Sequence, residues 1–531
     1  MTSDPSESER RGEVLELARE LLAGGRSAEV IALLTKLVAR NTELERQLAQ
    51  ILTRGRKNES TNTAQLLMFA DQVKRGEAAL PDDIIDANGK LCEAAGLELD
   101  RAVDGAETKP PRDQPSLRKP APPHLERVEN SLAVPAAERV CPTCGAERAC
   151  IGHDVTEVIE LIPAQVIVRV DRREKLACKS CEGELVRAPV GDKVVAGGRL
   201  GVALVAELVV DKYSDGLPLH RQKERFERLG LKLAVSTLAD QVTWATDLLR
   251  PLWRAAVCEV AAATVMHLDG TGLPVLDRDA PGGKRFGALW GYVGVSGDET
   301  VAAYLYNSTG KKVGQKPGEM GPEDVLAMRQ GYTVADASNL FDKSFKRDDL
   351  IECGCNMHAR RYFIKALDAG DARAALPLAA YKKLYEIEAA ICEREPDDVL
   401  AERLAQSKPL WDELIRWAGI MKPHEPPASP MGAALRYLTN HVTALGRFLE
   451  SGVVPIDNGI VERLHVRAAL TRKNYLFAGS DAGGERAAIA YTILANCRLL
   501  GINPVEYLTD VMPRLSRKIR LRDLTDLLPG R

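Results

Sequence analysis

The first strong hydrophobic pattern lies in residues 30–52, where two mostly apolar rows repeat every seven positions. One row contains Leu34, Asn41 and Leu48, and the companion row begins at Val30. This spacing predicts a coiled-coil helix, although an amphipathic helix packed inside its own domain fits the same pattern. Asn41 occupies a core row, where a polar side chain can set register and oligomeric state. We therefore expect a homodimer or a higher homo-oligomer.

A second pattern predicts strands and a helix in residues 256–364. Runs of β-branched and apolar residues at 264–269, 286–292, 300–306 and 331–336 are typical of strands, and 322–328 of a short helix. Three strands, a helix and a fourth strand are the opening order of a ribonuclease H-like fold, in which the first and fourth strands are neighbours. These two runs end in Asp269 and Asp336, so we expect the two acids to lie close together.

Shifts in composition divide the rest of the chain. Residues 107–135 are rich in proline and charge, which predicts an extended linker. The predicted fold class is multidomain α+β, with its parts in the following order. They are an N-terminal helical, coiled-coil arm (1–106), the linker (107–135), a zinc-ribbon-like module (136–198), a helical segment that includes a candidate helix-turn-helix (199–255), the first part of a ribonuclease H-like α/β catalytic core (256–364), a helical insertion (365–447), the final part of the core (448–510) and a basic C-terminal tail (511–531).

Composition points to a globular chain without a membrane span. Of its 531 residues, 45% are hydrophobic and 28% charged, and no apolar stretch is long enough to cross a bilayer. The polar N-terminus lacks a secretory signal, so we expect a cytoplasmic protein. The net charge of −3 does not indicate nucleic acid, but basic residues cluster locally. Such clusters are commonly solvated faces, yet local patches are also what contact phosphates.

Two Cys-x-x-Cys pairs predict a zinc site. Cys141 and Cys144 form the first pair, and Cys178 and Cys181 the second, with 33 residues between the pairs. Each short loop can direct two thiolates at one ion, as tetrahedral Zn²⁺ requires. Residues 155–170, between the pairs, are expected to form strands. The alternative is four reduced cysteines in a core.

The helical segment 199–255 leaves two interpretations open. A helix near residues 217–226, a turn at Gly230 and a helix capped by Ser236 are typical of a helix-turn-helix that reads DNA. An ordinary helical hairpin fits equally well.

The acidic residues predict a site for divalent metal. Two carboxylates held close together resist joint ionisation, and a pair of Mg²⁺ or Mn²⁺ ions removes that conflict. Such ions can activate water or a 3′-hydroxyl and stabilise the departing oxygen of a phosphodiester. Glu462 is the candidate third ligand, on a helix that Asp457 or Asn458 would cap. The residues expected to contact DNA phosphates are Arg360, Arg361, Arg463, Arg467, Arg472 and Lys473.

Other residues in the core have less defined roles. Cys355 and His358 have a spacing that permits metal binding, with Cys353 as a further candidate ligand, but two ligands make an incomplete zinc site. We favour a structural or site-shaping role for them. His267 lies on the same strand face as Asp269, where it either lines the cleft or is a core histidine with its bonds satisfied.

Taken together, the motifs resemble transposases of the insertion sequence 66 family along nearly the whole chain. The resemblance implies a leucine-zipper-like arm, a zinc-binding segment, a helix-turn-helix and a catalytic domain whose acidic triad matches Asp269, Asp336 and Glu462. It also implies a bacterial protein that is associated with the nucleoid when bound to DNA, and for some members small accessory proteins from the same element. The motifs begin at Cys141 (CPTCG), Ile151 (IGHDVTE), Ile162 (IPA), Lys212 (KYSDGLPLHRQ), Gly354 (GCNMHARRYF), Asp457 (DNGIVER) and Arg472 (RKNYLFAGS).

This sequence departs from the family pattern at three positions. Gly270 stands where Glu often follows the first Asp, Ser338 stands where a Tyr is usual, and Gly459 replaces an Asn. None of these changes removes a triad carboxylate.

The sequence thus predicts a metal-dependent DNA transposase that cleaves element ends and joins the 3′-hydroxyls to target DNA. The alternative is a catalytically weak or silent DNA-binding regulator derived from such an enzyme. A tyrosine recombinase that attacks through Tyr475 or Tyr491 needs no carboxylate triad, and a non-catalytic scaffold accounts only for the first 200 residues.

Overall fold

The computed structural model describes residues 81–96, 127–128, 139, 143–147, 165–176, 186–188, 198–309, 320–336, 340–517, 520 and 523–531. The predicted coiled coil at 30–52, most of the linker, and the module cysteines other than Cys144 lie outside these residues. None of the described helices is both long enough and apolar enough to cross a membrane.

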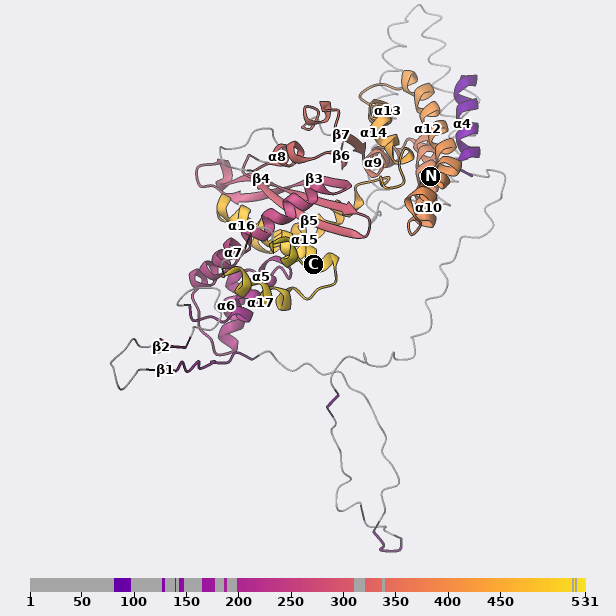
Figure 1. Cartoon of the computed structure of the whole chain (residues 1–531). Helices are drawn as coiled ribbons and strands as arrows, with labels where there is room; N and C mark the ends of the chain where they lie inside the picture. Colours follow the sequence, from indigo (N-terminus) through magenta and orange to yellow (C-terminus); the bar gives the residue numbers. More distant parts are fainter. Residues whose placement is uncertain are drawn as a thin grey trace, which may run out of the picture.

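A five-stranded mixed sheet forms the centre of the molecule (Figure 1). Strand β3 pairs antiparallel with β4 and parallel with β6, β5 continues the antiparallel side, and β7 the parallel side. The predicted adjacency of the first and fourth strands is therefore confirmed, whereas β7 was not predicted. The strands, in sheet order, are β5 (Glu299–Asn307), β4 (Lys284–Ser296), β3 (Val265–Leu276), β6 (Gly331–Ala335) and β7 (Leu350–Gly354).

Strand β3 extends farther than the sequence indicated. The prediction ended the strand at Asp269 because Gly270 and Gly272 are typical of a turn, but β3 continues to Leu276. Beyond Asp269 its partner is β4, which pairs with it as far as Leu276–Lys284. Asp269 thus lies inside the strand, and the prediction that the strand ends there was wrong.

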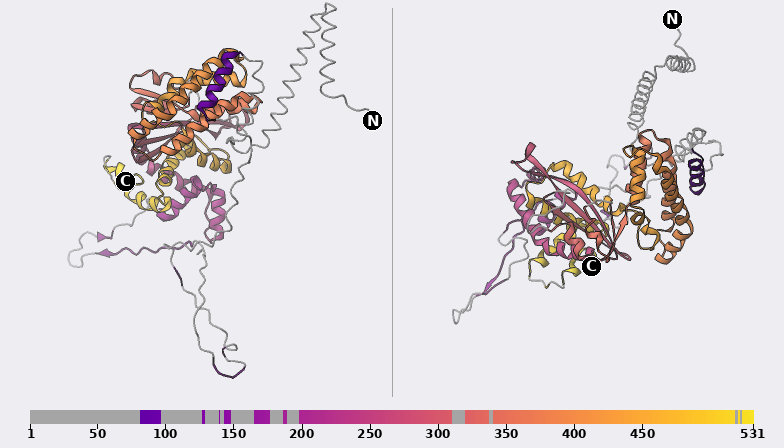
Figure 2. Two further views of the ribbon diagram at one scale, coloured as in Figure 1. Left: turned by 90° about the vertical axis from the view of Figure 1, so that its right-hand side faces the viewer. Right: turned by 90° about the horizontal axis from the view of Figure 1, so that it is seen from above.

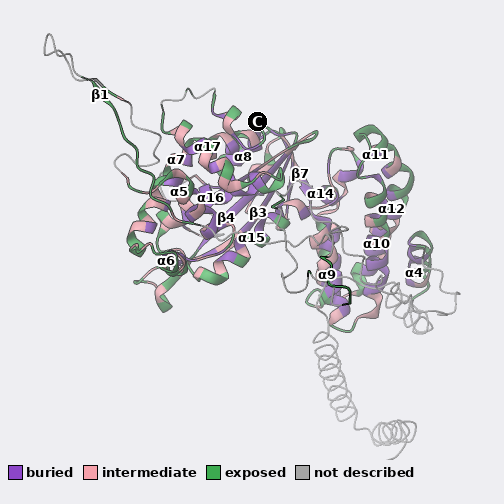
Figure 3. Ribbon diagram, turned by 90° about the horizontal axis from the view of Figure 1, so that it is seen from below, coloured by how far each residue is buried: buried purple, intermediate pink, exposed green. Residues whose placement is uncertain are grey.

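Helices cover both faces of the sheet, and the buried residues between these layers form two hydrophobic cores (Figure 3). One face packs against α15 (Gly459–Tyr475) and α16 (Asp481–Leu499). The other packs against α8 (Pro322–Met328) and the C-terminal part of α7 (Val235–Ala262). The predicted short helix at 322–328 is confirmed.

Within the described part of the chain, the outer edge of β5 is covered by side chains and is not paired with another strand. Asn496 of α16 accepts a hydrogen bond from the backbone N–H of Ala302 and donates one to its carbonyl, each at 2.8 Å. Thr492 accepts from the N–H of Tyr304, and Trp253 donates to the carbonyl of Tyr304. These bonds satisfy edge groups that would otherwise offer a template for pairing with another chain.

Arg329 fixes β3 against β6. This side chain is buried and donates to the carbonyls of Ala263, Thr264 and Tyr332, the last two at 2.9 and 2.6 Å. Burial lowers the pKa of the Arg329 guanidinium to about 10. Because these carbonyls lie where β3 and β6 begin, one cation sets the register of the two strands.

The helical segment before the sheet contains α5 (Val202–Tyr213), α6 (Leu219–Arg228) and the start of α7. The turn between α6 and α7 includes Gly230, whose φ of 83° suits glycine. The predicted cap was wrong, since α7 begins at Val235 with Ala234 as its N-cap. Helices α6 and α7 follow one another across a short turn, and α7 then runs on into the core of the sheet domain.

A second helical body lies beside β7, where the helical insertion was predicted (Figures 1 and 2). The predicted break at residues 423–430 is confirmed, since α13 begins at Pro430. Helix α4 (Asp82–Ala94), from the N-terminal arm, packs against this body in the same hydrophobic core. The body's helices are α9 (Asn356–Asp368), α10 (Ala375–Ile391), α11 (Pro396–Glu402), a π-helix (Arg403–Ser407), α12 (Lys408–Met421), α13 (Pro430–Asn440) and α14 (Val442–Gly446).

The described part of the basic tail packs on the domain. Helix α17 (Pro504–Leu515) contacts α5, and Leu524 and Leu528 after it are buried. The terminal residue Arg531 forms ion pairs with Glu259 and Glu299 at 3.2 and 2.9 Å. These residues are therefore part of the fold rather than a free extension.

The contact between α4 and the insertion gives a first prediction. The indole Nε1 of Trp417 on α12 donates to the side-chain oxygen of the buried Asn88, at 2.9 Å. Asn88→Ala leaves that buried donor without its acceptor, which costs about 1–3 kcal/mol. We expect faster amide hydrogen exchange in α4, with β3 unchanged. Lys90→Ala is the control, because it removes only an exposed ion pair with Asp86; equal exchange in both variants would contradict the docking.

Candidate functional site

Strand register brings the two candidate aspartates level with each other. The parallel pairing of β3 with β6 ends with His267 opposite Val334. Carried on by two residues, this register would set Asp269 level with Asp336, the residue that directly follows β6. Asp269 lies on the same face of β3 as His267, the face that carries α15, because side chains two residues apart on a strand share a face.

Helix α15 is fixed to this face by Asn458, its buried N-cap residue. The Asn458 amide donates to the carbonyl of Leu268 at 2.8 Å, and its oxygen lies 2.9 Å from Nδ1 of His267. The backbone N–H of Asn458 donates to the Sγ of Cys355, at 3.3 Å. Asp457 instead bonds to the first N–H of the helix, that of Gly459. Of the two predicted capping residues, Asp457 therefore caps the helix and Asn458 docks it.

His465, two turns along α15, contacts the first aspartate. Its Nε2 lies 3.1 Å from the carbonyl oxygen of Asp269 and 3.6 Å from a carboxylate oxygen of the same residue. Gly291, the β4 partner of Asp269, makes room for the ring, since a Cβ there would lie 2.7 Å from it. This role of His465 was not predicted from the sequence, where its position three residues after Glu462 was the available signal.

The departure from the family pattern at Gly270 has a steric reason. A Cβ at this position would lie 2.5 Å from the ring of Trp290, its partner on β4. The indole therefore fills the space that a glutamate side chain would enter. Ser338 lies outside the described residues.

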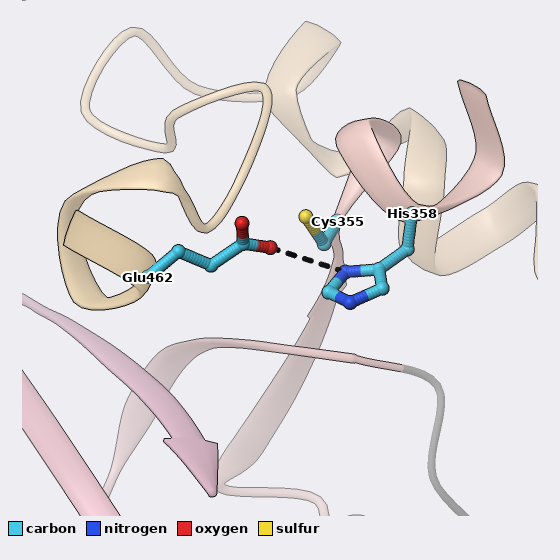
Figure 4. Close-up of side chains that lie close together, drawn as sticks. All are labelled: Cys355, His358 and Glu462. Atoms are coloured by element: carbon cyan, nitrogen blue, oxygen red, sulfur yellow. Dashed lines mark ion pairs between the residues drawn. The ribbon is translucent and has the colours of Figure 1, made fainter. Parts of the chain in front are cut away.

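Glu462 projects from α15 toward α9 (Figure 4). Arg361 donates to both of its carboxylate oxygens, at 3.3 and 2.9 Å, and Nδ1 of His358 lies 3.7 Å from one of them. Over the described ranges, one group of three residues has metal-ligating atoms that all lie within 4.8 Å of one another. These residues are Cys355, His358 and Glu462. The three candidate catalytic acids do not form such a set, and Arg361 contacts one of these acids.

The two cysteines of this region lie in different environments. Cys355 is the N-cap residue of α9, whereas Cys353 lies on β7 and its Sγ donates to the carbonyl of Ile351. Burial raises the pKa of each thiol to about 12. Cys353 is not part of the group formed by Cys355, His358 and Glu462.

The predicted phosphate-contacting residues differ in their exposure. Arg463, Arg467 and Lys473 are exposed on α15, and Arg360 is half-buried on α9. Arg472 donates to Thr271 and to the carbonyl of Gly272, so it also braces β3.

Two hollows near α15 contain further cations that were not predicted from the sequence. Arg498 of α16 lines one hollow together with Arg467. Lys212 of α5 and Arg486 of α16 line the other. Burial, and then the nearby Arg486, lower the pKa of the Lys212 ammonium. Lys212 begins one of the motifs on which the family resemblance rests, and that was the available sign in the sequence of a role for this lysine.

The two candidate tyrosine nucleophiles are bound to each other. Their hydroxyl oxygens, on Tyr475 and Tyr491, lie 2.9 Å apart, and Thr471 lies 2.6 Å from the second. Burial raises the pKa of both phenols. These contacts give the pair a packing role and do not favour attack on DNA.

The described residues of the predicted zinc module are few. Cys144 is exposed in a turn that continues into Gly145, whose φ is 72°. Strand β1 (Lys175–Leu176) pairs antiparallel with β2 (Val186–Arg187), and the second cysteine pair lies in the sequence between them. Residues 165–170, predicted as strand, do not belong to a strand in this described stretch.

Comparison with known proteins finds two family matches. Residues 197–486 match the Transposase IS66 family, and residues 138–182 match the zinc-finger binding domain of transposase IS66. Among similar proteins of Sinorhizobium fredii, uncharacterized protein y4hP is 31% identical over 509 residues, covering 92% of this chain and 88% of its own. Uncharacterized protein y4jD is 28% identical, with 77% and 80% covered, and uncharacterized protein y4qI is 28% identical, with 86% and 85% covered.

The buried His267 predicts a pH-dependent stability. Burial lowers its pKa from 6.5 to about 4, so the folded state favours the neutral ring. Its contribution is complete above pH 6.5 and is lost as the pH falls toward 4, with a loss of about 2 kcal/mol between pH 7 and pH 5. Urea unfolding in EDTA should show that His267→Asn flattens this part of the pH profile.

The same replacement at the exposed His220 is the control for the general effect of losing a histidine. A pH profile of His267→Asn parallel to that of the unchanged protein would contradict the assignment.

Proposed function

The chain belongs to the IS66 family of transposases, and from this premise we propose that it cleaves the DNA ends of a mobile element and joins their 3′-hydroxyls to target DNA. Asp269, Asp336 and Glu462 are proposed as the acidic triad. We also propose that the sheet is the core of a ribonuclease H-like fold, since the β5-β4-β3-β6-β7 order sets the first and fourth strands side by side.

The observation that supports this proposal best is the register of β3 and β6, which would set Asp269 and Asp336 side by side when it is extended by two residues. Asp269 lies on β3, and Asp336 directly follows β6, the parallel neighbour of β3. Glu462 lies on that helix between Asn458, which bonds to β3 just before Asp269, and His465, which contacts Asp269 itself. The three acids thus come from elements that meet at one part of one sheet face.

These donors fit hard divalent cations such as Mg²⁺ or Mn²⁺, which prefer carboxylate oxygens. When bound, a pair of such ions would activate the attacking oxygen and stabilise the departing one. In the proposed first step water attacks the phosphorus at an element end and a 3′-hydroxyl leaves. In the second step that 3′-hydroxyl attacks a target phosphodiester, so one bond forms as another breaks.

The chain's own side chains would prepare the site for these steps. Arg361 must release the carboxylate of Glu462 before that carboxylate can turn toward the aspartates. His465 holds Asp269 through its carbonyl and carboxylate, and so acts as a positioning residue. The exposed cations Arg463, Arg467 and Lys473 on the same helix are suited to the backbone of the bound strand.

The other domains have proposed roles in assembly and DNA recognition. The zinc-finger match supports zinc binding, and we assign the ion to Cys141, Cys144, Cys178 and Cys181. The hairpin of α6 and α7 is proposed to contact element DNA, and the N-terminal arm to join two copies so that two ends are held together. Small accessory proteins from the same element are further proposed partners.

One observation favours a second candidate function, that of a catalytically silent DNA-binding regulator. The ion pair between Arg361 and Glu462 holds the third acid toward α9, and a chain locked in that arrangement would bind DNA without cutting it. Metal-dependent nicking, measured together with DNA binding, separates the two functions.

Removing single triad carboxylates should abolish catalysis while DNA binding remains. We expect Asp269→Asn, Asp336→Asn and Glu462→Gln each to lower Mg²⁺-dependent cleavage and strand transfer by roughly 100-fold or more, because each loses charge needed to hold the ions. Asp298→Asn, in the exposed turn between β4 and β5, is the matched control. Full activity of any triad variant would refute its assignment.

The cations of α15 should contribute to DNA affinity independently of sequence. Arg467→Gln and Lys473→Gln should each reduce the slope of log affinity against log salt by about 0.9, as expected when one phosphate contact is lost. Lys408→Gln, an exposed cation of the insertion that pairs with Asp412, is the control. Unchanged slopes in both α15 variants would place the DNA elsewhere.

A further inference from the structure

A second set of metal-binding side chains lies next to the proposed triad. The ligating atoms of Cys355, His358 and Glu462 all lie within 4.8 Å of one another, and the close-up shows the three side chains converging on one point (Figure 4). Ligands of tetrahedral Zn²⁺ lie about 2.0–2.3 Å from the ion and hence roughly 3.3–3.8 Å from each other. Side-chain shifts of about 1 Å would complete such a site.

The surroundings of these three side chains also fit a metal. Nδ1 of His358 is buried, and among the described residues it has no hydrogen-bond partner. The N–H of Asn458 donates to Cys355 Sγ, and Arg361 donates to Glu462, which are outer contacts of the kind that orient metal ligands. Cys355 is the N-cap residue of α9, and His358 lies in the first turn of that helix.

Strand register places this set one strand beyond the aspartates. Ala335 of β6 pairs with Gly354 of β7, so Asp336 and Cys355 come next at the same level. The same register, carried on from β3, would set Asp269, Asp336 and Cys355 in one row, with the last two just past the ends of β6 and β7. Glu462, which reaches over this row from α15, lies at the Cys355 end of it.

We propose that Cys355, His358 and Glu462 form a regulatory site for a thiophilic transition metal such as Zn²⁺. One thiolate, one imidazole and one carboxylate are typical zinc ligands, and three of them leave a fourth position for water. Binding releases the thiol proton of Cys355 to solvent, and the charges of thiolate and carboxylate balance the dication. The site is separate from the four-cysteine module.

The regulatory consequence rests on the proposed function, because the site uses the third acid of the triad. Glu462 cannot hold Zn²⁺ beside Cys355 and also complete the Mg²⁺ site beside Asp269. Occupancy of the zinc site therefore switches off cleavage without displacing DNA, since the exposed cations of α15 are not ligands.

Zinc titration of the reduced, full-length protein tests the binding. After the four-cysteine module has been loaded, the unchanged protein should take up one further equivalent, measured by metal analysis after gel filtration. His358→Ala should weaken this uptake by roughly 100-fold, and Cys355→Ser should also lose it. Cys353→Ser is the matched control, because Cys353 is a neighbouring buried thiol outside the set, and it should retain the second equivalent.

Thermal unfolding in EDTA checks that the variants fold. Equal zinc uptake by the unchanged protein and His358→Ala would overturn the proposal, whatever the outcome of the cleavage assays. In excess Mg²⁺, stoichiometric added Zn²⁺ should inhibit cleavage by the unchanged protein but not by His358→Ala. Zinc uptake without any Mg²⁺-dependent cleavage would refute the proposed function and leave the metal site standing.

Discussion

The position of the candidate site depends on one buried side chain, Asn458. Its amide bonds to β3 at His267 and Leu268, and its backbone N–H bonds to Cys355 after β7. These bonds join β3 and the end of β7 to the N-cap residue of α15. Together with the contacts of His465 with Asp269 and of Arg472 with Thr271 and Gly272, they set the position of Glu462 along the sheet. The register set by Arg329 supplies the complementary constraint, since it aligns β3 with β6.

Much of the sheet domain could be predicted because its signals are local. Runs of β-branched and apolar residues predicted β4 and β5, and the short helix predicted at 322–328 is α8, as the structure confirms. Strand β7 was missed because its five residues include Glu352 and are too short for a clear period. The end of β3 was misplaced because glycine usually indicates a turn, whereas Gly270 is required here by the packing of Trp290. That requirement comes from a partner strand and cannot be read from the residues around Gly270.

The candidate acids could be proposed from their order along the chain, but their contacts could not. Arg361 was expected to meet DNA phosphates and instead donates to Glu462 from a helix 101 residues away in sequence. Such pairings depend on how the insertion sits beside β7, which no periodicity encodes. Cys355 and His358 were favoured as site-shaping residues because two ligands make an incomplete zinc site. The fold brings Glu462 to them, and so supplies the third ligand that spacing alone could not indicate.

The acids of this site are shared among competing partners. Ionised carboxylates repel one another, and here Glu462 pairs with Arg361 while Asp269 lies beside His465. Arg361 donates to both carboxylate oxygens of Glu462 and would have to release them for the proposed triad to form. Asn458 holds α15 on β3, so the backbone of Glu462 stays fixed while its side chain changes partners. In the two proposed arrangements Glu462 serves either the Mg²⁺ site or the zinc site. The cation that binds Glu462 therefore decides whether the proposed triad can form.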